Sequence, residues 1–183
     1  KAVDAPESPA FSPDGSRVAF SALQDGVGDI WVVDVVTGDL TNLTKDAFAD
    51  FSPTFSPDGK TLVYTARISG NDKLFQFDLA TGQKTQLTFG THDDTAAKFY
   101  NSTTVLFTST AIDPAIPITP EIARNASIPN VWTLDLSTGA LKQLTDTMSG
   151  NVSPVVLRTD DAPRVAFVSY YKGENLINTI AMD

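Results

Sequence analysis

The sequence contains no cysteine and only one histidine, His92. The lack of cysteine excludes disulfides, zinc fingers and thiol catalysis together. No apolar run approaches the roughly 18 residues that a membrane-spanning helix needs. Acidic residues outnumber basic ones by 22 to 13, and the resulting net charge of -9 disfavours nucleic acid as a partner. The chain starts at Lys1 without a visible signal peptide, so we expect that a leader was removed or that this is a piece of something longer.

Catalytic motifs are also lacking. There is no Gly-x-Ser-x-Gly segment, no glycine-rich phosphate loop and no His-Glu-x-x-His pair, and no serine signature stands beside the only histidine. A carboxylate pair assembled from separate loops, for example from Asp25, Asp93 and Asp146, stays open, although no spacing argues for it. The sequence therefore predicts a protein that is not an enzyme and has no catalytic residue, no cofactor and no metal ion.

What the sequence does contain is a repeat. The residues Ser8 to Gly15, Ser-Pro-Ala-Phe-Ser-Pro-Asp-Gly, return 44 residues later as Ser52 to Gly59. A third copy keeps this spacing at Phe99 but has Asn101-Ser102 in place of Pro-Asp-Gly, and a fourth, beginning at Ser153, follows after 57 residues. The later part of the unit recurs too, as Asp29–Asp34, Lys73–Asp78 and Asn130–Asp135, and then as Leu40–Thr44, Lys84–Thr88 and Leu141–Thr145.

Each unit is expected to hold four short strands, which in the first unit are residues 8–12, 17–22, 29–35 and 40–44. The third strand is apolar on both faces, as in a blade covered on each side by another blade. A period in the low forties with four strands per unit predicts an all-β β-propeller of four-stranded antiparallel blades. A right-handed solenoid is the alternative. We expect four blades, at about 8–44, 52–88, 96–145 and 152–183, the last incomplete, as part of a larger ring or of one closed by a strand from elsewhere.

These blocks resemble the TolB-like (WD40-like, PD40-type) propeller repeat. The basic residue expected after the turn glycine is Lys60 in the second unit, whereas Ser16 holds that place in the first and Arg17 follows it. The resemblance implies six blades and a non-catalytic protein-binding or scaffold role in the bacterial cell envelope, or as an accessory periplasmic subunit of a membrane complex. It also implies an exported chain whose partner is another protein. The alternatives are the substrate-gating propeller of a prolyl-oligopeptidase-like or tricorn-like peptidase whose catalytic domain is absent from this chain, and, more distantly, a sugar- or lyase-type propeller enzyme.

Antiparallel strands place the first and third turns of every blade on one rim and the remaining connections on the other. The first rim is predicted to be structural, with Asp34, Asp78 and Asp135 capping turns. The second is expected to be longer and more varied, because the connection at 110–129 carries 13 extra residues. Its prolines and isoleucines predict either an apolar arm that docks on a partner or an insertion folded over its own blade. The isoleucines are Ile112, Ile116, Ile118 and Ile122.

Two further groups of residues are candidates on this second rim. Tyr170 and Tyr171, expected in a loop of the fourth unit, suit an interface but would equally pack on a missing blade. The acidic group is predicted to be a solvated face or, alternatively, a site for a cation or a basic partner. It consists of Asp46, Asp50, His92, Asp93, Asp94 and Asp146.

Overall fold

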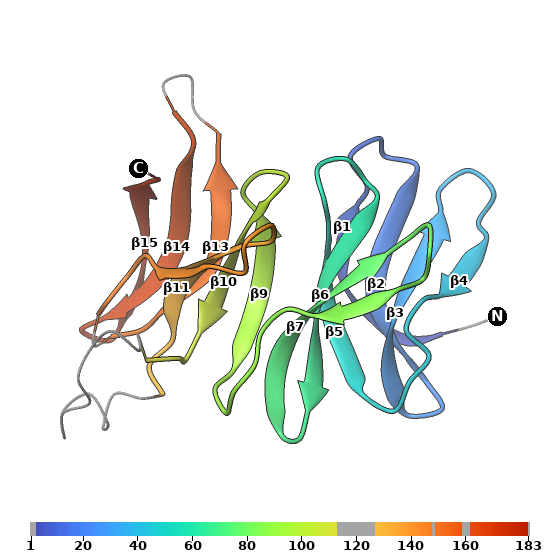
Figure 1. The fold of residues 1–183 in the computed structure, drawn as a ribbon, viewed down its shortest axis with the longest axis horizontal. Coiled ribbons are helices and arrows are strands. Elements are labelled where there is room, and N and C mark those ends of the chain that lie inside the picture. Colours follow the sequence, from blue (N-terminus) through green and yellow to red (C-terminus); the bar gives the residue numbers. More distant parts are fainter. Residues whose placement is uncertain (1–2, 113–126, 148, 159–161, 183) are drawn as a thin grey trace. The chain divides into compact units, whose positions relative to one another are not determined.

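The computed structural model describes residues 3–112, 127–147, 149–158 and 162–182. Its strands form four separate antiparallel sheets, which confirms the predicted all-β fold and its blades (Figure 1). No helix in the described part of the chain is long and apolar enough to cross a membrane. The chain divides into two compact units, residues 1–89 and 90–183, each of which contains two sheets.

Unit 1 contains two four-stranded sheets in which neighbours in sequence are neighbours in space. The first sheet is β1 (Asp4–Phe11), β2 (Arg17–Gln24), β3 (Val27–Asp34) and β4 (Leu40–Asn42). The second sheet is β5 (Ala49–Phe55), β6 (Thr61–Ile68), β7 (Asn71–Asp78) and β8 (Lys84–Gln86). The sheets pack together through one apolar cluster made of Ala19, Ile30, Val32, Phe55, Leu62, Tyr64, Ala66 and Phe77.

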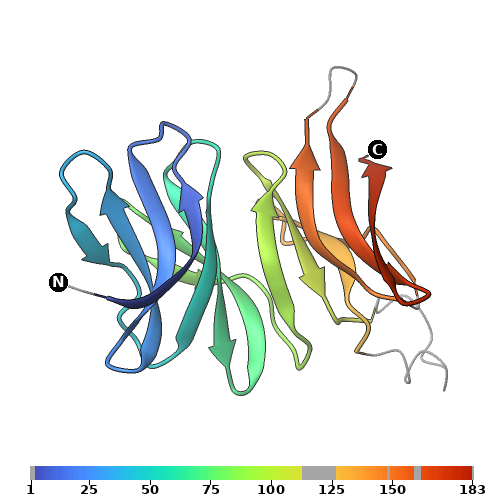
Figure 2. The same cartoon turned by 180° about the vertical axis from the view of Figure 1, so that it is seen from behind.

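Unit 2 repeats this arrangement with one sheet of four strands and one of three. The four-stranded sheet is β9 (Asp94–Phe99), β10 (Thr104–Ser109), β11 (Asn130–Asp135) and β12 (Leu141–Gln143). The three-stranded sheet is β13 (Asn151–Leu157), β14 (Arg164–Tyr171) and β15 (Glu174–Ala181), side by side in Figure 2. The apolar contact between them consists of Leu106, Val131, Val165 and Phe167.

The Ser-Pro-Asp-Gly turn is closed by its serine. In the second blade the Ser56 hydroxyl accepts the Thr61 amide hydrogen at 3.0 Å and donates to Asp58 Oδ1 at 2.6 Å. Ser56 is buried, and its backbone oxygen accepts from the Gly59 amide, which lies in the left-handed region that favours glycine. The repeated serine therefore satisfies the first backbone donor of the next strand as well as the turn carboxylate.

Replacing this serine should destabilise unit 1. Ser56→Ala removes a buried acceptor and leaves the Thr61 amide unpaired, so we expect a loss of about 1–2 kcal/mol in the free energy of unfolding. The matched control is Ser16→Ala, since that hydroxyl donates only to Asp14 at the surface. Urea unfolding measures both changes, and equal losses for the two variants would contradict this account of the turn.

The other repeated blocks have structural roles too. Asp34 Oδ1 accepts the amide hydrogens of Val36 and Thr37, which lower the pKa of that carboxyl, and Asp78 and Asp135 do the same in their blades. The predicted turn caps are therefore confirmed. The threonine of the Leu-Thr block accepts a backbone amide hydrogen of the third strand, as Thr44 does from Ile30 at 3.0 Å, with Thr88 and Thr145 equivalent to it.

A β-bulge interrupts the first strand of every blade at the same point. Its residues, which have φ near +54°, are Ser8, Ser52, Ala96 and Ser153, and the strand register shifts there. Three of the four precede proline. The sequence analysis expected plain strands at these positions.

The connection between the second and third strands is short in three of the four blades. The second and third strands of blades one, two and four are joined by two-residue turns, Asp25-Gly26, Ser69-Gly70 and Lys172-Gly173. All six residues have positive φ, the geometry of a type I′ turn, whose twist matches that of the flanking strands. Such a turn needs no extra residues, so these three connections are short.

Candidate functional site

The predicted apolar arm lies mostly outside the described residues. Ile116, Ile118 and Ile122 are among those not described, while Ile112 is half-buried after β10. The docking role of the arm stays a prediction.

Tyr170 and Tyr171 lie at the end of β14 and not in a loop, because the turn that follows them has only two residues. Their exposed fractions are 55% and 53%. The Lys172 ammonium lies 5.3 Å from the centre of the Tyr171 ring, a distance at which a cation and an aromatic face attract. Unit 2 therefore presents a pair of aromatic side chains with a positive charge beside them.

Tyr170 also lines a pocket of unit 2. The pocket walls come from the start of β13, from β14 and from the segment that enters β11, and its apolar members are Ile128, Pro129, Val152 and Val168. Gly150, at φ +78°, passes the Pro129 ring so closely that a Cβ there would lie 3.4 Å from it. Asn151 donates its amide hydrogen to the Pro129 carbonyl at 2.7 Å. The pocket is thus built on hydrogen-bonded backbone.

The acidic residues do not all lie at the surface. In unit 2, Asp146 is exposed, whereas Asp94 is buried with its Oδ2 atom 3.2 Å from His92 Nε2, and Asp93 is half-buried. In unit 1, Asp46 is half-buried and Asp50, on β5, is buried. Within the described ranges, no group of three His, Asp or Glu residues is placed to hold a metal ion.

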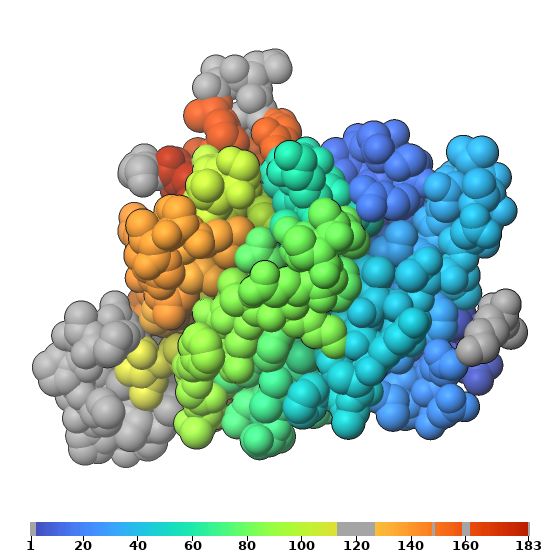
Figure 3. Space-filling view, turned by 45° about the vertical axis from the view of Figure 1, so that its right-hand side comes forward, coloured from blue at the N-terminus to red at the C-terminus, as the bar shows by residue number. Residues whose placement is uncertain are grey.

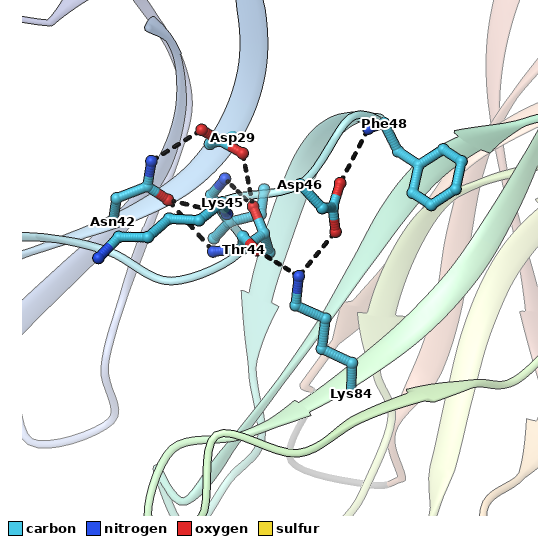
Figure 4. A network of polar contacts seen from close by, with 8 residues as sticks. Asp29, Asn42, Thr44, Lys45, Asp46, Phe48 and Lys84 are labelled. Carbon is cyan, nitrogen blue, oxygen red and sulfur yellow. Dashed lines mark hydrogen bonds and ion pairs between the residues drawn. The ribbon is translucent and has the colours of Figure 1, made fainter.

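Asp46 belongs to a polar network at the connection between the first two blades (Figure 4). Asp29, buried at the start of β3, accepts hydrogen bonds from Asn42 Nδ2 at 2.7 Å and from the Thr44 hydroxyl at 3.2 Å. Lys84, on β8, donates to the Thr44 carbonyl and forms an ion pair with Asp46 Oδ2 at 2.6 Å. In the space-filling view the cyan connecting segment meets the green atoms of the second blade (Figure 3).

Among the carboxyl groups that the structure describes, Asp50 is the one with two buried oxygens that both lack a hydrogen-bond partner. Burial is the main reason that its pKa is raised to about 7; nearby Asp46 and Asp29 also raise the pKa, whereas the Thr44 hydroxyl and Lys84 lower it. The Thr44 hydroxyl has a single hydrogen and donates it to Asp29, so it leaves Asp50 without a donor. Burial, and then Asp50, raise the pKa of Tyr64 on the neighbouring strand.

Asp46 and Asp50 belong to the acidic group predicted from the sequence, whereas Asp29, Thr44 and Lys84 were not predicted as site residues. A signal was available, because Asp29 stands where the other two aligned blocks have Lys73 and Asn130. Among these three aligned blocks, only the first has a carboxylate at this position.

Antiparallel sheets of four strands, or of three in the last blade, recur in order and pack face to face within each unit, and this arrangement defines the protein as a β-propeller. The chain belongs to the TolB β-propeller domain family (PD40), whose model matches residues 3–119. A comparison with curated protein sequences gives no match.

Solved structures show the same fold. TolB from Acinetobacter baumannii is 24% identical with a TM-score of 0.65, over 97% of this chain and 44% of that one. A protein assigned as TolB from Agrobacterium tumefaciens is 19% identical with a TM-score of 0.77, over 98% of this chain and 65% of that one. A puromycin hydrolase is 15% identical with a TM-score of 0.73, over 98% of this chain and 27% of that one. The chain thus spans less than two thirds of each of these proteins.

Proposed function

We propose that this chain is the non-catalytic, protein-binding part of a TolB-like propeller that works in the bacterial cell envelope. Membership of the TolB β-propeller domain family supports the class of protein. Export and an envelope partner, either a single protein or a membrane-associated complex, follow by analogy with TolB.

The observation that carries the proposal is the pair of exposed tyrosines that ends β14, of which Tyr170 lines an apolar pocket. Tyrosine is enriched at protein interfaces because its ring offers a large rigid contact area and its hydroxyl a hydrogen bond. Tyr170 and Tyr171 end a strand that is hydrogen-bonded on both sides, so their backbone is already ordered before a partner binds. Preordered contacts lose less entropy on binding.

Affinity capture from native membranes tests the binding surface. The double variant Tyr170→Ala, Tyr171→Ala should weaken retention of a captured protein by at least about tenfold, as expected when aromatic anchor residues are lost. Val36→Ala is the matched control, since Val36 is 89% exposed on a turn of unit 1. An unchanged set of captured proteins would remove this surface from the proposal, and deletion of residues 110–129 would test the predicted arm in the same way.

The peptidase alternative predicts that a catalytic domain accompanies this propeller, whereas the proposed function needs none. A gating domain has no activity of its own, and its catalytic domain would supply a Gly-x-Ser-x-Gly segment followed by Asp and His. Such a segment later in the same polypeptide would favour the alternative. Turnover of peptide or ester substrates by the 183-residue chain itself would contradict the non-catalytic proposal.

A further inference from the structure

Asp50 has an equivalent in the last blade. Asp50 stands two residues before the bulge residue Ser52 of β5, and Asn151 stands two residues before the bulge residue Ser153 of β13. Both side chains are buried, with exposed fractions of 2% and 1%. The two sites can therefore be compared contact by contact.

Asn151 has a complete set of polar partners. Its Nδ2 atom donates to Asn130 Oδ1 at 3.0 Å and to Thr147 Oγ1 at 2.6 Å, and its Oδ1 atom accepts from the Ser169 hydroxyl at 2.6 Å. Asn130 comes from the neighbouring blade and Ser169 from the paired strand β14. A neutral amide, which both donates and accepts, fits this site.

Each of these partners is different around Asp50. Asp29 takes the place of Asn130, and Asp46 takes the place of Thr147. On the paired strand, Ala66 lies opposite Asp50 where Ser169 lies opposite Asn151. The three replacements are two carboxylates and a methyl group, and none of them is a donor at neutral pH. An ionised Asp50 would be a third carboxylate in this environment, whereas a protonated Asp50 brings the one donor that the site lacks.

The other charged or titratable groups around Asp50 do not remove this conflict. Lys84 reaches in from β8, but its ammonium is held by the Thr44 carbonyl and by Asp46. Tyr64, from β6, is buried and neutral. Glu7, from β1, and Arg67, from β6, line the same pocket as Asp50, but Arg67 is paired with Asp72 at 2.8 Å. The carboxylates therefore outnumber the cations at this contact between two blades.

We propose that the contact between the first two blades is a pH-dependent switch, closed while Asp50 carries a proton and released when Asp50 is ionised. The segment that responds is the connection of residues 43–49, which is joined to this cluster through Thr44 and Asp46 and carries the exposed Phe48. The switch does not rest on the proposed function.

The direction of the pH effect follows from linkage. The pKa of Asp50 is about 7 in the folded chain against an ordinary value of 3.8, so folding takes up a proton between these two values. The stability of the contact is complete below about pH 4 and is lost as the pH rises through 7. A rise in pH across 7 would therefore release the contact between the first two blades, and a fall would restore it.

Hydrogen exchange of the full chain at pH 6 and pH 8, corrected for intrinsic rates, tests the switch. We expect the protection of amides in residues 43–50 to fall by about tenfold from pH 6 to pH 8 in the wild type, the change that one group with a pKa near 7 produces. Asp50→Asn should keep its protection at both pH values. The equivalent segment before Asn151 is the internal control and should not change in either protein. The proposal is overturned if the wild type keeps its protection at pH 8, or if Asp50→Asn loses it to the same extent.

A second measurement needs no variant and so stands even if Asp50→Asn fails to fold. The carboxyl ¹³C resonances of the aspartates should include one whose titration midpoint in the wild type lies within about one unit of 7. Midpoints below 5 for every aspartate would overturn the proposal.

Discussion

Asn151→Asp should destabilise unit 2 by about 3–5 kcal/mol at pH 8, the range found when a buried polar network is left with an unpaired charge. The substitution changes the shape of the side chain very little, but it replaces the Nδ2 donor with an oxygen. That oxygen would face Asn130 Oδ1 and Thr147 Oγ1, the two atoms that accept hydrogen bonds from Asn151 Nδ2 in the wild type. At pH 4 the new carboxyl can carry a proton and restore one donor, so the loss should be smaller there.

The two tryptophans allow this effect to be assigned to its unit. Trp31 lies in unit 1 and Trp132 in unit 2, so a Trp→Phe change at one position leaves fluorescence that reports on the other. Urea unfolding followed by Trp132 should show the loss. Asn175→Asp is the matched control, because Asn175 is exposed and should change stability by less than about 0.5 kcal/mol. Equal losses at pH 4 and pH 8 would show that charge is not the cause.

Leu62→Ala should destabilise unit 1 by about 3 kcal/mol, within the range of about 2–5 kcal/mol for truncation of a buried leucine. Leu62 has no exposed surface and belongs to the cluster through which the first two blades pack. Removing the methine and the two methyl carbons of this side chain loses apolar burial and leaves a cavity between two sheets, which can relax only by moving relative to each other.

The same fluorescence experiment, now followed by Trp31, measures this second loss. Leu23→Ala is the control, because Leu23 lies in the same unit but is 40% exposed, and it should cost less than about 1 kcal/mol. If the two leucine variants were equally stable, the cluster would not be the main apolar contact of unit 1.

Much of the fold could be predicted from the sequence because the repeat marks every boundary. The Pro-Asp-Gly and Thr-Gly turns recur at fixed distances from alternating apolar strands, so four matched copies correct one another where a single copy would be ambiguous. The turn between the first two strands of the third blade lacks Pro-Asp-Gly but is closed in a similar way. Asn101 Oδ1 accepts the Thr103 and Thr104 amide hydrogens in place of the missing aspartate.

The candidate sites were harder to predict, because their properties come from contacts between blades. Asp50 looks like a surface residue in an acidic loop, and only the packing of β5 on the first sheet buries it. Tyr170 and Tyr171 were expected in a loop because a two-residue Lys-Gly turn is a weaker signal than Asn-Gly or Asp-Gly. Burial and pKa depend here on neighbours 20 or more residues away, so the local sequence does not predict them.

The bulge in the first strand of every blade has a consequence for how a chain of near-identical segments reaches one native arrangement. Sliding a strand by one position would turn its apolar side chains to the wrong face. A residue at φ near +54° followed by a rigid pyrrolidine ring can occupy only one position along its partner, so Ser8, Ser52 and Ser153 each fix their strand against slippage. Tandem duplication of a blade thus copies the bulge together with the strands, and each new copy would fold with the correct strand register.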